Sequence, residues 1–147
     1  MSQHVIEMPD LGIGTFRLEG KTAYNSVQMA LDIGFRHIDT AQIYGNEEQV
    51  GKAIKDSSVP RSEIFITTKV WNDKLNKAKF VDSVKQSLEK LQLDYVDLLL
   101  IHWPSPSNGE KMSEYLTELK KVKELGLAKH IGVSNFTIAN LKEAMQT

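Results

Sequence analysis

The stretch Val96-Asp97-Leu98-Leu99-Leu100-Ile101-His102-Trp103 has the length and aliphatic character of a β-strand that is buried on both faces. Four other short stretches are also apolar and often β-branched, namely residues 11–16, 35–40, 64–70 and 130–135. We therefore predict five strands along the chain.

Amphipathic stretches separate the predicted strands. The clearest one repeats Val81, Val84, Leu88 and Leu91 at spacings of three and four residues, which places them on one helical face. The other predicted helical faces are made of Val27, Ala30 and Leu31, of Val50, Ala53 and Ile54, of Leu116 and Leu119, and of Ile138, Leu141, Ala144 and Met145. Strands and helices that alternate in this way predict an α/β fold with a parallel sheet and right-handed crossovers.

The predicted sheet is either open and doubly wound or closed as a barrel, and periodicity alone leaves both open. A doubly wound dinucleotide-binding sheet should show Gly-x-Gly-x-x-Gly after its first strand. The first predicted strand offers only Gly12 and Gly14, followed by Thr15, Phe16 and Arg17, which disfavours the doubly wound fold. The 147 residues contain no linker or low-complexity run, so we expect one domain.

The composition is that of an ordinary globular protein, with a formal net charge of -1. This charge gives no general attraction for nucleic acid or acidic membranes, so we expect neither as a partner. There is no cysteine, which excludes disulfides and thiolate metal sites. No apolar run approaches the roughly 20 residues of a membrane helix, and the amino terminus lacks the features of a signal peptide. We therefore expect a cytoplasmic protein.

Polar residues stand at the carboxyl ends of the predicted strands, where α/β folds gather ligand-binding and catalytic groups. They are Asp39, Lys69, His102, Ser134 and Asn135. Each has an ordinary structural alternative: the carboxylate and the Ser–Asn pair could cap helices, the lysine could be solvated, and the imidazole could hold structure by a hydrogen bond. Their occurrence together at one end of the sheet favours a functional site.

These groups suit proton-coupled hydride transfer to a carbonyl if Tyr44, in the loop after the second predicted strand, joins them. Tyr44 could simply cover that loop, but a tyrosine can also supply the proton that the carbonyl oxygen needs. A nearby lysine lowers the pKa of a tyrosine from about 10, a carboxylate holds the lysine charged, and a neutral histidine donates to the carbonyl oxygen. Serine and asparagine offer donors and acceptors for a nicotinamide carboxamide.

From about Pro9 to its end, the sequence resembles the aldo-keto reductase family. The segments that carry the resemblance are residues 34–41 with Glu47, Val50 and Gly51; residues 93–98 leading into His102, Trp103 and Pro104; and residues 132–136. The resemblance implies a (β/α)8 barrel of the TIM type. The short loops are similar to those of small bacterial members that reduce 2,5-diketo-D-gluconate or methylglyoxal.

The same resemblance implies NADP(H)-dependent reduction of aldehydes and ketones to alcohols. Its catalytic tetrad would be Asp39, Tyr44, Lys69 and His102, with the tyrosine as proton donor, the lysine and its aspartate tuning it, and the histidine orienting the carbonyl. The cofactor-binding residues would be Thr15, Asp39, Ser134 and Asn135, and the substrate pocket would contain Phe16, Trp71 and Trp103. The alternative for the three aromatic residues is ordinary core packing.

Barrels of this family are roughly twice as long as this sequence. We therefore expect residues 1–147 to be the amino-terminal part of a barrel, truncated to about five βα units, without the segment that grips the adenosine 2′-phosphate. Unpaired edge strands would favour self-association. Two other functions stay open: a catalytically inactive barrel fragment that serves as a scaffold or cofactor-sensing module, and a metal-dependent barrel hydrolase. The complete tetrad disfavours the first, and the small number of metal-ligand residues at strand ends disfavours the second.

Overall fold

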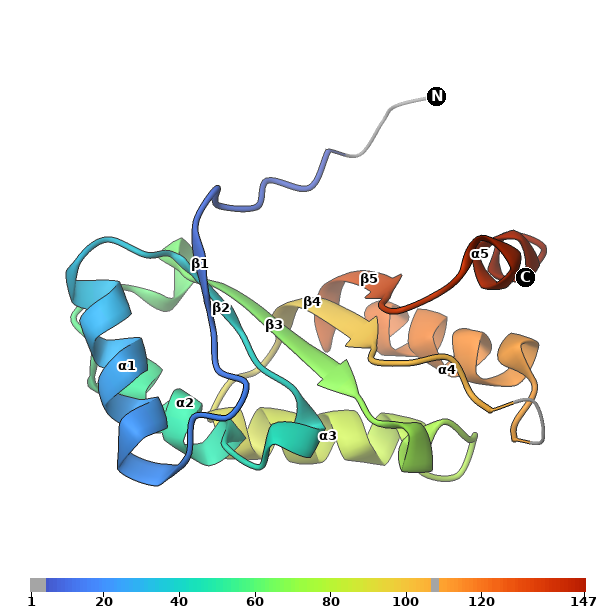
Figure 1. Ribbon diagram of the computed structural model, residues 1–147, viewed down its shortest axis with the longest axis horizontal. Helices are drawn as coiled ribbons and strands as arrows, with labels where there is room; N and C mark the ends of the chain where they lie inside the picture. Colours follow the sequence, from blue (N-terminus) through green and yellow to red (C-terminus); the bar gives the residue numbers. More distant parts are fainter. Residues whose placement is uncertain (1–4, 107–108) are drawn as a thin grey trace.

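The computed structural model describes residues 5–106 and 109–147. Residues 1–4, on which the expectation of no signal peptide rests, lie outside the described residues. Strands and helices alternate throughout these ranges (Figure 1). The strands are β1 (Gly12–Gly14), β2 (His37–Asp39), β3 (Phe65–Val70), β4 (Val96–Ile101) and β5 (Ala128–Val133). The α-helices are α1 (Gly20–Asp32), α2 (Glu47–Asp56), α3 (Phe80–Leu91), α4 (Met112–Glu124) and α5 (Ile138–Ala144). Short 3-10 helices are η1 (Gln42–Tyr44), η2 (Arg61–Glu63) and η3 (Asn72–Lys74).

The five strands form one parallel sheet in the order β1-β2-β3-β4-β5, which confirms the predicted α/β topology. The predicted strand ends are wrong in several places. The first strand stops at Gly14 because the chain turns at Thr15, and Arg17 has a left-handed backbone with a φ of 62°. The fifth runs two residues earlier than predicted, so Ser134 and Asn135 follow the strand rather than end it.

Helices α1 to α4 lie on one side of the sheet (Figure 1). Alternation along β3 sorts its side chains as predicted: Ile66 and Val70 are fully buried on the helix side, and Thr68 bonds to a side chain of α2. The predicted helical stripes enter this core, which includes Val27, Val50, Ile54, Val84, Leu88 and Leu91.

Helices α2 and α3 approach each other closely at Gly51. A β-carbon at this position would lie 2.5 Å from the backbone carbonyl group of Leu91, which is far inside van der Waals contact. Only a residue without a side chain therefore fits this crossing.

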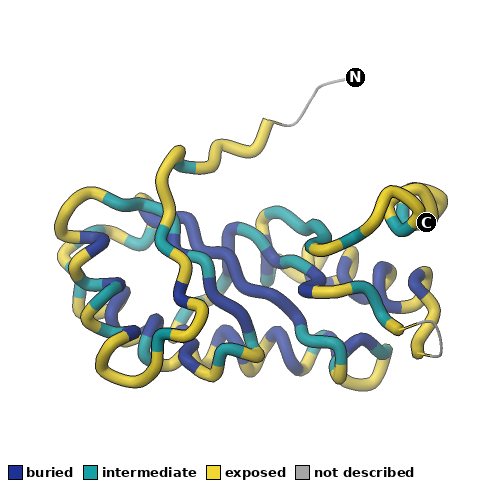
Figure 2. Tube along the Cα trace, in the orientation of Figure 1, coloured by how far each residue is buried: buried dark blue, intermediate teal, exposed yellow. Residues whose placement is uncertain are grey.

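Helix α5 differs from the other helices because none of its residues is buried (Figure 2). Its predicted apolar residues Ile138 and Leu141 are exposed. The helix begins with a capping box in which the Thr137 hydroxyl accepts from the backbone N–H of Asn140 at 3.1 Å. The alternative that Ser134 and Asn135 cap this helix is therefore wrong.

Across the described ranges, no helix combines the length and the apolar character that crossing a membrane requires.

Candidate active site

Lys69 is the centre of a polar cluster at the carboxyl end of the sheet. It precedes the last residue of β3, and it is only 7% exposed. Its ammonium group forms an ion pair with Asp39 at the end of β2 and donates to the Thr40 carbonyl oxygen at 3.0 Å. The phenol oxygen of Tyr44 lies 3.5 Å from the same nitrogen. A buried ammonium thus meets one carboxylate, one carbonyl and one phenol.

Tyr44 reaches this cluster from the turn η1, which follows β2. Gly45 ends the turn with a φ of 66°, a left-handed conformation that glycine adopts without strain. The Tyr44 ring centroid lies 5.7 Å from that of His102, edge to face, and 5.2 Å from that of Phe16. The structure therefore brings the four predicted tetrad residues together at one rim.

His102 follows directly after β4 and is 9% exposed. Burial lowers the pKa of His102 below its ordinary value of 6.5, and the charge of Lys69 lowers it further, while Asp39 acts in the opposite direction. The imidazole is therefore neutral at pH 7. Its Nδ1 is buried and has no hydrogen-bond partner among the described residues.

The three predicted pocket aromatics surround this rim unequally. Trp71 packs edge to face on His102, with ring centroids 5.2 Å apart. Phe16 and Trp103 are 60% and 46% exposed, respectively, although both are large and apolar. Two exposed aromatic side chains near an ion pair whose carboxylate is itself 35% exposed form a surface that an organic ligand can cover.

The predicted cofactor residues fall into two groups. Thr15 is fully buried, and its amide and hydroxyl both donate to the Asp39 carbonyl oxygen, at 3.0 and 3.2 Å. Ser134 and Asn135 instead lie at the accessible rim, where the Asn135 amide donates to the His102 carbonyl oxygen at 2.9 Å. Asn135 has a φ of 59°, a left-handed conformation that asparagine tolerates better than most residues do. Thr15 is thus closed to a ligand, whereas Asp39, whose side chain is 35% exposed, and the second group are accessible.

Sequence reasoning missed a set of polar residues, four buried and one half-buried, on the helix side of β3. It comprises Gln42, Glu47, Thr68, Ser83 and Ser87, and we call it the rear network. A signal was present, since Ser83 and Ser87 are four residues apart on the otherwise apolar stripe of α3. Polar groups on a buried helix face require hydrogen-bond partners.

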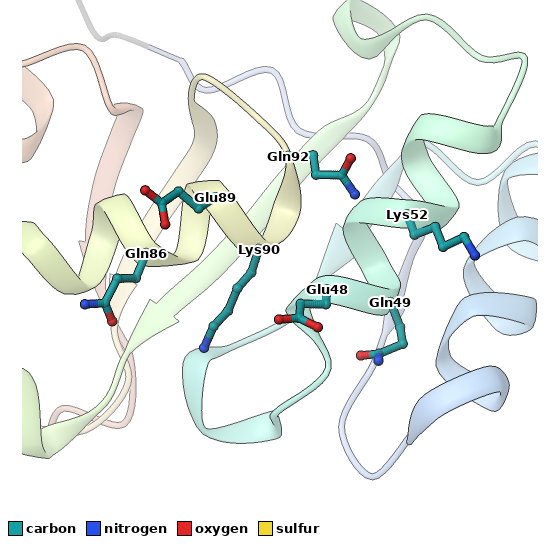
Figure 3. Close-up of a pocket in the computed structure, with 7 residues that line it drawn as sticks. All are labelled: Glu48, Gln49, Lys52, Gln86, Glu89, Lys90 and Gln92. Carbon is teal, nitrogen blue, oxygen red and sulfur yellow. The ribbon is translucent and has the colours of Figure 1, made fainter.

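A separate surface groove of about 690 Å³ lies between α2 and α3, away from the tetrad (Figure 3). Its lining consists of charged and amide side chains: Glu48, Gln49, Lys52, Gln86, Glu89, Lys90 and Gln92. No group of three or more His, Asp or Glu residues that could hold a metal occurs in the described ranges.

The comparisons with known proteins agree with this geometry. Residues 10–147 match the model of the aldo/keto reductase family. The chain is 51% identical over 140 residues to the methylglyoxal reductase DkgB of Yersinia pestis, covering 95% of this chain and 52% of that protein. It is 46% identical over 135 residues to the methylglyoxal reductase DkgA of Escherichia coli K12, covering 92% and 48%.

Solved structures give the same result. The crystal structure of MGS-M4, an aldo-keto reductase enzyme from a deep-sea metagenome library, superposes with a TM-score of 0.91 at 48% identity, covering 96% of this chain and 51% of that one. These matches confirm the resemblance and the barrel-type fold. The chain spans about half the length of the curated relatives it matches.

Proposed function

Because the chain belongs to the aldo/keto reductase family, we propose that it carries the proton-transfer residues of an NADP(H)-dependent carbonyl reductase, which converts aldehydes and ketones to alcohols. The observation that carries this proposal is the contact of Tyr44 with the buried Lys69, which pairs with the half-buried Asp39, beside a neutral His102.

Each residue of the tetrad has one task in this proposal. Tyr44 gives its hydroxyl proton to the carbonyl oxygen as that oxygen gains negative charge, and in the reverse direction it takes the proton back. Lys69, 3.5 Å from the phenol oxygen, stabilises the negative charge that develops on that oxygen, and Asp39 holds the lysine in place. His102 donates from Nε2 to the same carbonyl oxygen and sets its direction.

NADP(H), when bound, supplies the hydride that adds to the carbonyl carbon. Ser134 and Asn135 fit the nicotinamide carboxamide because both lie at the rim next to His102 and offer donors and acceptors. Thr15 contributes indirectly, since it fixes the backbone of Asp39. As substrates we propose small aldehydes and ketones such as methylglyoxal, on the strength of the relatives' names and of the exposed Phe16 and Trp103.

The proposal is tested by NADPH oxidation in the presence of methylglyoxal. We expect Tyr44→Phe to lower the rate by about 100-fold or more, because only the proton donor is lost. Tyr24→Phe is the matched control, since the Tyr24 hydroxyl bonds to the Asp56 carboxylate on the helix surface. Equal rates for the wild type and Tyr44→Phe would remove Tyr44 from the mechanism. The absence of turnover in the wild type would refute activity of these residues on their own.

We also propose that the chain self-associates through the side of the sheet away from the helices. β1 and β5 are the edges of the sheet in the described ranges, and Leu98 and Leu100 are half-buried on the side that carries no helix. Edge strands and apolar sheet faces pair readily with another chain. Light scattering should then show dimers or larger species, whereas a compact monomer that binds no hydrophobic dye would contradict the proposal.

A further inference from the structure

The rear network begins at Glu47, which is 3% exposed. One carboxylate oxygen accepts from the Thr68 hydroxyl at 2.8 Å, and the other accepts from the Ser87 hydroxyl at 3.2 Å. Thr68 precedes Lys69 and points to the opposite side of β3. A buried carboxylate on α2 is thus tied both to α3 and to the strand that carries the candidate catalytic lysine.

Gln42 joins this network with its whole side-chain amide. The amide nitrogen donates to the hydroxyl oxygens of Ser83 and Ser87, at 3.1 and 3.2 Å. The amide oxygen accepts from the backbone N–H of Trp71 at 3.0 Å. The amide therefore bridges α3 and the end of β3.

The direction of the Gln42 amide is fixed by its partners. The Ser83 hydroxyl already donates to the Phe80 carbonyl oxygen at 2.8 Å, and the Ser87 hydroxyl donates to Glu47. Each hydroxyl has one hydrogen, so toward Gln42 both serines can only accept. The amide nitrogen must face α3 and the oxygen must face β3.

This arrangement bears directly on Tyr44, because Gln42 is the first residue of the turn that ends with Tyr44. The network contacts Thr68 on β3 and Trp71 directly after it, and these residues stand on either side of Lys69 in the sequence. The network thus fixes the tyrosine turn relative to the strand of the lysine. The Lys69–Tyr44 separation of 3.5 Å is already at the limit of a hydrogen bond, so a small displacement of the turn breaks it.

We infer that Gln42 is a positioning residue that sets the contact between Tyr44 and Lys69 from the rear of the sheet. This inference rests on the proposed function for its catalytic meaning. The effect of Gln42 on the contact between Tyr44 and Lys69 can be measured without enzymatic turnover.

The direct readout is the NMR signal of the Lys69 ε-methylene group in protein with 13C-labelled lysine. The Lys69 Nζ lies 5.2 Å from the centroid of the Tyr44 ring, so the ring current shifts this signal, and Tyr44→Leu gives the unshifted reference. We expect Gln42→Leu and Gln42→Glu to move the signal toward that reference. Gln42→Glu keeps the size of the side chain but removes both donors and sets a second carboxylate against Ser87.

Gln28→Leu is the matched control. The Gln28 amide donates to the Ala53 carbonyl oxygen at 2.7 Å and joins α1 to α2 outside the rear network. It should leave the Lys69 signal unchanged. A wild-type Lys69 signal in Gln42→Leu, or an equal change in Gln28→Leu, would overturn the inference. Should the Gln42 variants fail to fold, Ser83→Ala decides: it removes one acceptor and must move the signal in the same direction by less, and no movement overturns the inference.

Kinetics separate the inference from the proposed function. In a chain that turns over, Gln42→Leu should lower kcat by about tenfold and leave the KM for NADPH within about twofold, because positioning and not cofactor binding is lost. If the wild type shows no turnover while the Lys69 signal still responds to Gln42, the proposed function fails and the positioning role stands.

Discussion

Two ion pairs of similar chemistry stand at opposite ends of the sheet and make different use of it. At the amino end, Asp97 on β4 accepts from Arg61 at 2.8 Å and from the Ile66 amide at 2.9 Å. Arg61 also donates to the Tyr95 carbonyl oxygen at 3.0 Å. Backbone groups thus flank this pair, and the exposed Lys129 ammonium lies 4.0 Å from the other Asp97 carboxylate oxygen.

At the carboxyl end, the pair of Lys69 and Asp39 leads instead to the hydroxyl of Tyr44, beyond which Phe16 is exposed. The Arg61–Asp97 pair contacts backbone groups that come together only when the chain folds. The Lys69–Asp39 pair contacts a phenol that can exchange a proton. The comparison teaches that an ion pair serves stability or chemistry according to its last partner.

The largest expected effect comes from removing the cation at the carboxyl end. Lys69→Met should lower NADPH-dependent reduction by about 100-fold or more, because the charge beside the phenol is lost, while the circular dichroism spectrum stays that of the wild type. Lys74→Met is its control, since Lys74 pairs with Asp73 on the exposed turn η3. A rate within about threefold of the wild type would mean that Lys69 does not assist proton transfer.

The amino-end pair should show the opposite response. Asp97→Asn removes the charge that faces the partly buried Arg61, so the free energy of unfolding should fall by about 2–4 kcal/mol, measured by urea denaturation. The reduction rate of the folded variant should remain that of the wild type. Asp73→Asn, at a surface pair, should change stability by less than about 1 kcal/mol. If Asp97→Asn lowered the free energy of unfolding by no more than Asp73→Asn does, the ion pair at the amino end of the sheet would not serve stability.

The smallest effect is a pH dependence from the rear network. Burial raises the pKa of Glu47 above its ordinary value of 4.5, while the hydrogen bonds from Thr68 and Ser87 and the charge of Lys90 act against the shift. Figure 3 shows Lys90 extending from α3. The folded state then holds the proton more tightly than the unfolded state, so this group's contribution to stability falls as pH rises from 4.5 through the raised pKa.

Glu47→Gln cannot titrate, so its urea midpoint should decline less than that of the wild type over this pH range. Glu48→Gln, at the exposed neighbour on α2, should follow the wild type. A parallel decline in all three proteins would show that Glu47 ionises alike in the folded and unfolded states.

Much of the fold follows from patterns that are local in the sequence. The apolar run at Val96 predicts β4, and the alternation along β3 predicts that Lys69 and Thr68 face opposite sides. The meeting of Asp39, Lys69 and His102 at one rim was also predictable, since parallel strands deliver their last residues to one edge. Strand ends were less predictable, because the turn at Thr15 depends on hydrogen bonds to Asp39, which is distant in the sequence.

The rear network shows why the remainder escaped prediction. The hydrogen bonds of Gln42 join it to Trp71 and to α3, some 29 to 45 residues away, and no local period marks such partners. Two serines on an apolar stripe indicate that hydrogen-bond partners exist, but they do not indicate which residues these partners are.

The close crossing of α2 and α3 at Gly51 also affects the candidate active site, although Gly51 does not contact Tyr44. On α2, Gly51 stands one helical turn after Glu47, and on α3, Leu91 stands one turn after Ser87. The backbone contact of Gly51 with Leu91 and the hydrogen bond of Glu47 with Ser87 are therefore neighbouring contacts between the same two helices. Because the contact at Gly51 has room only for a hydrogen atom, it sets the distance between the helices that the Glu47–Ser87 hydrogen bond must span. Gly51, which has no side chain, thereby acts on the position of the Tyr44 phenol through Ser87 and Gln42.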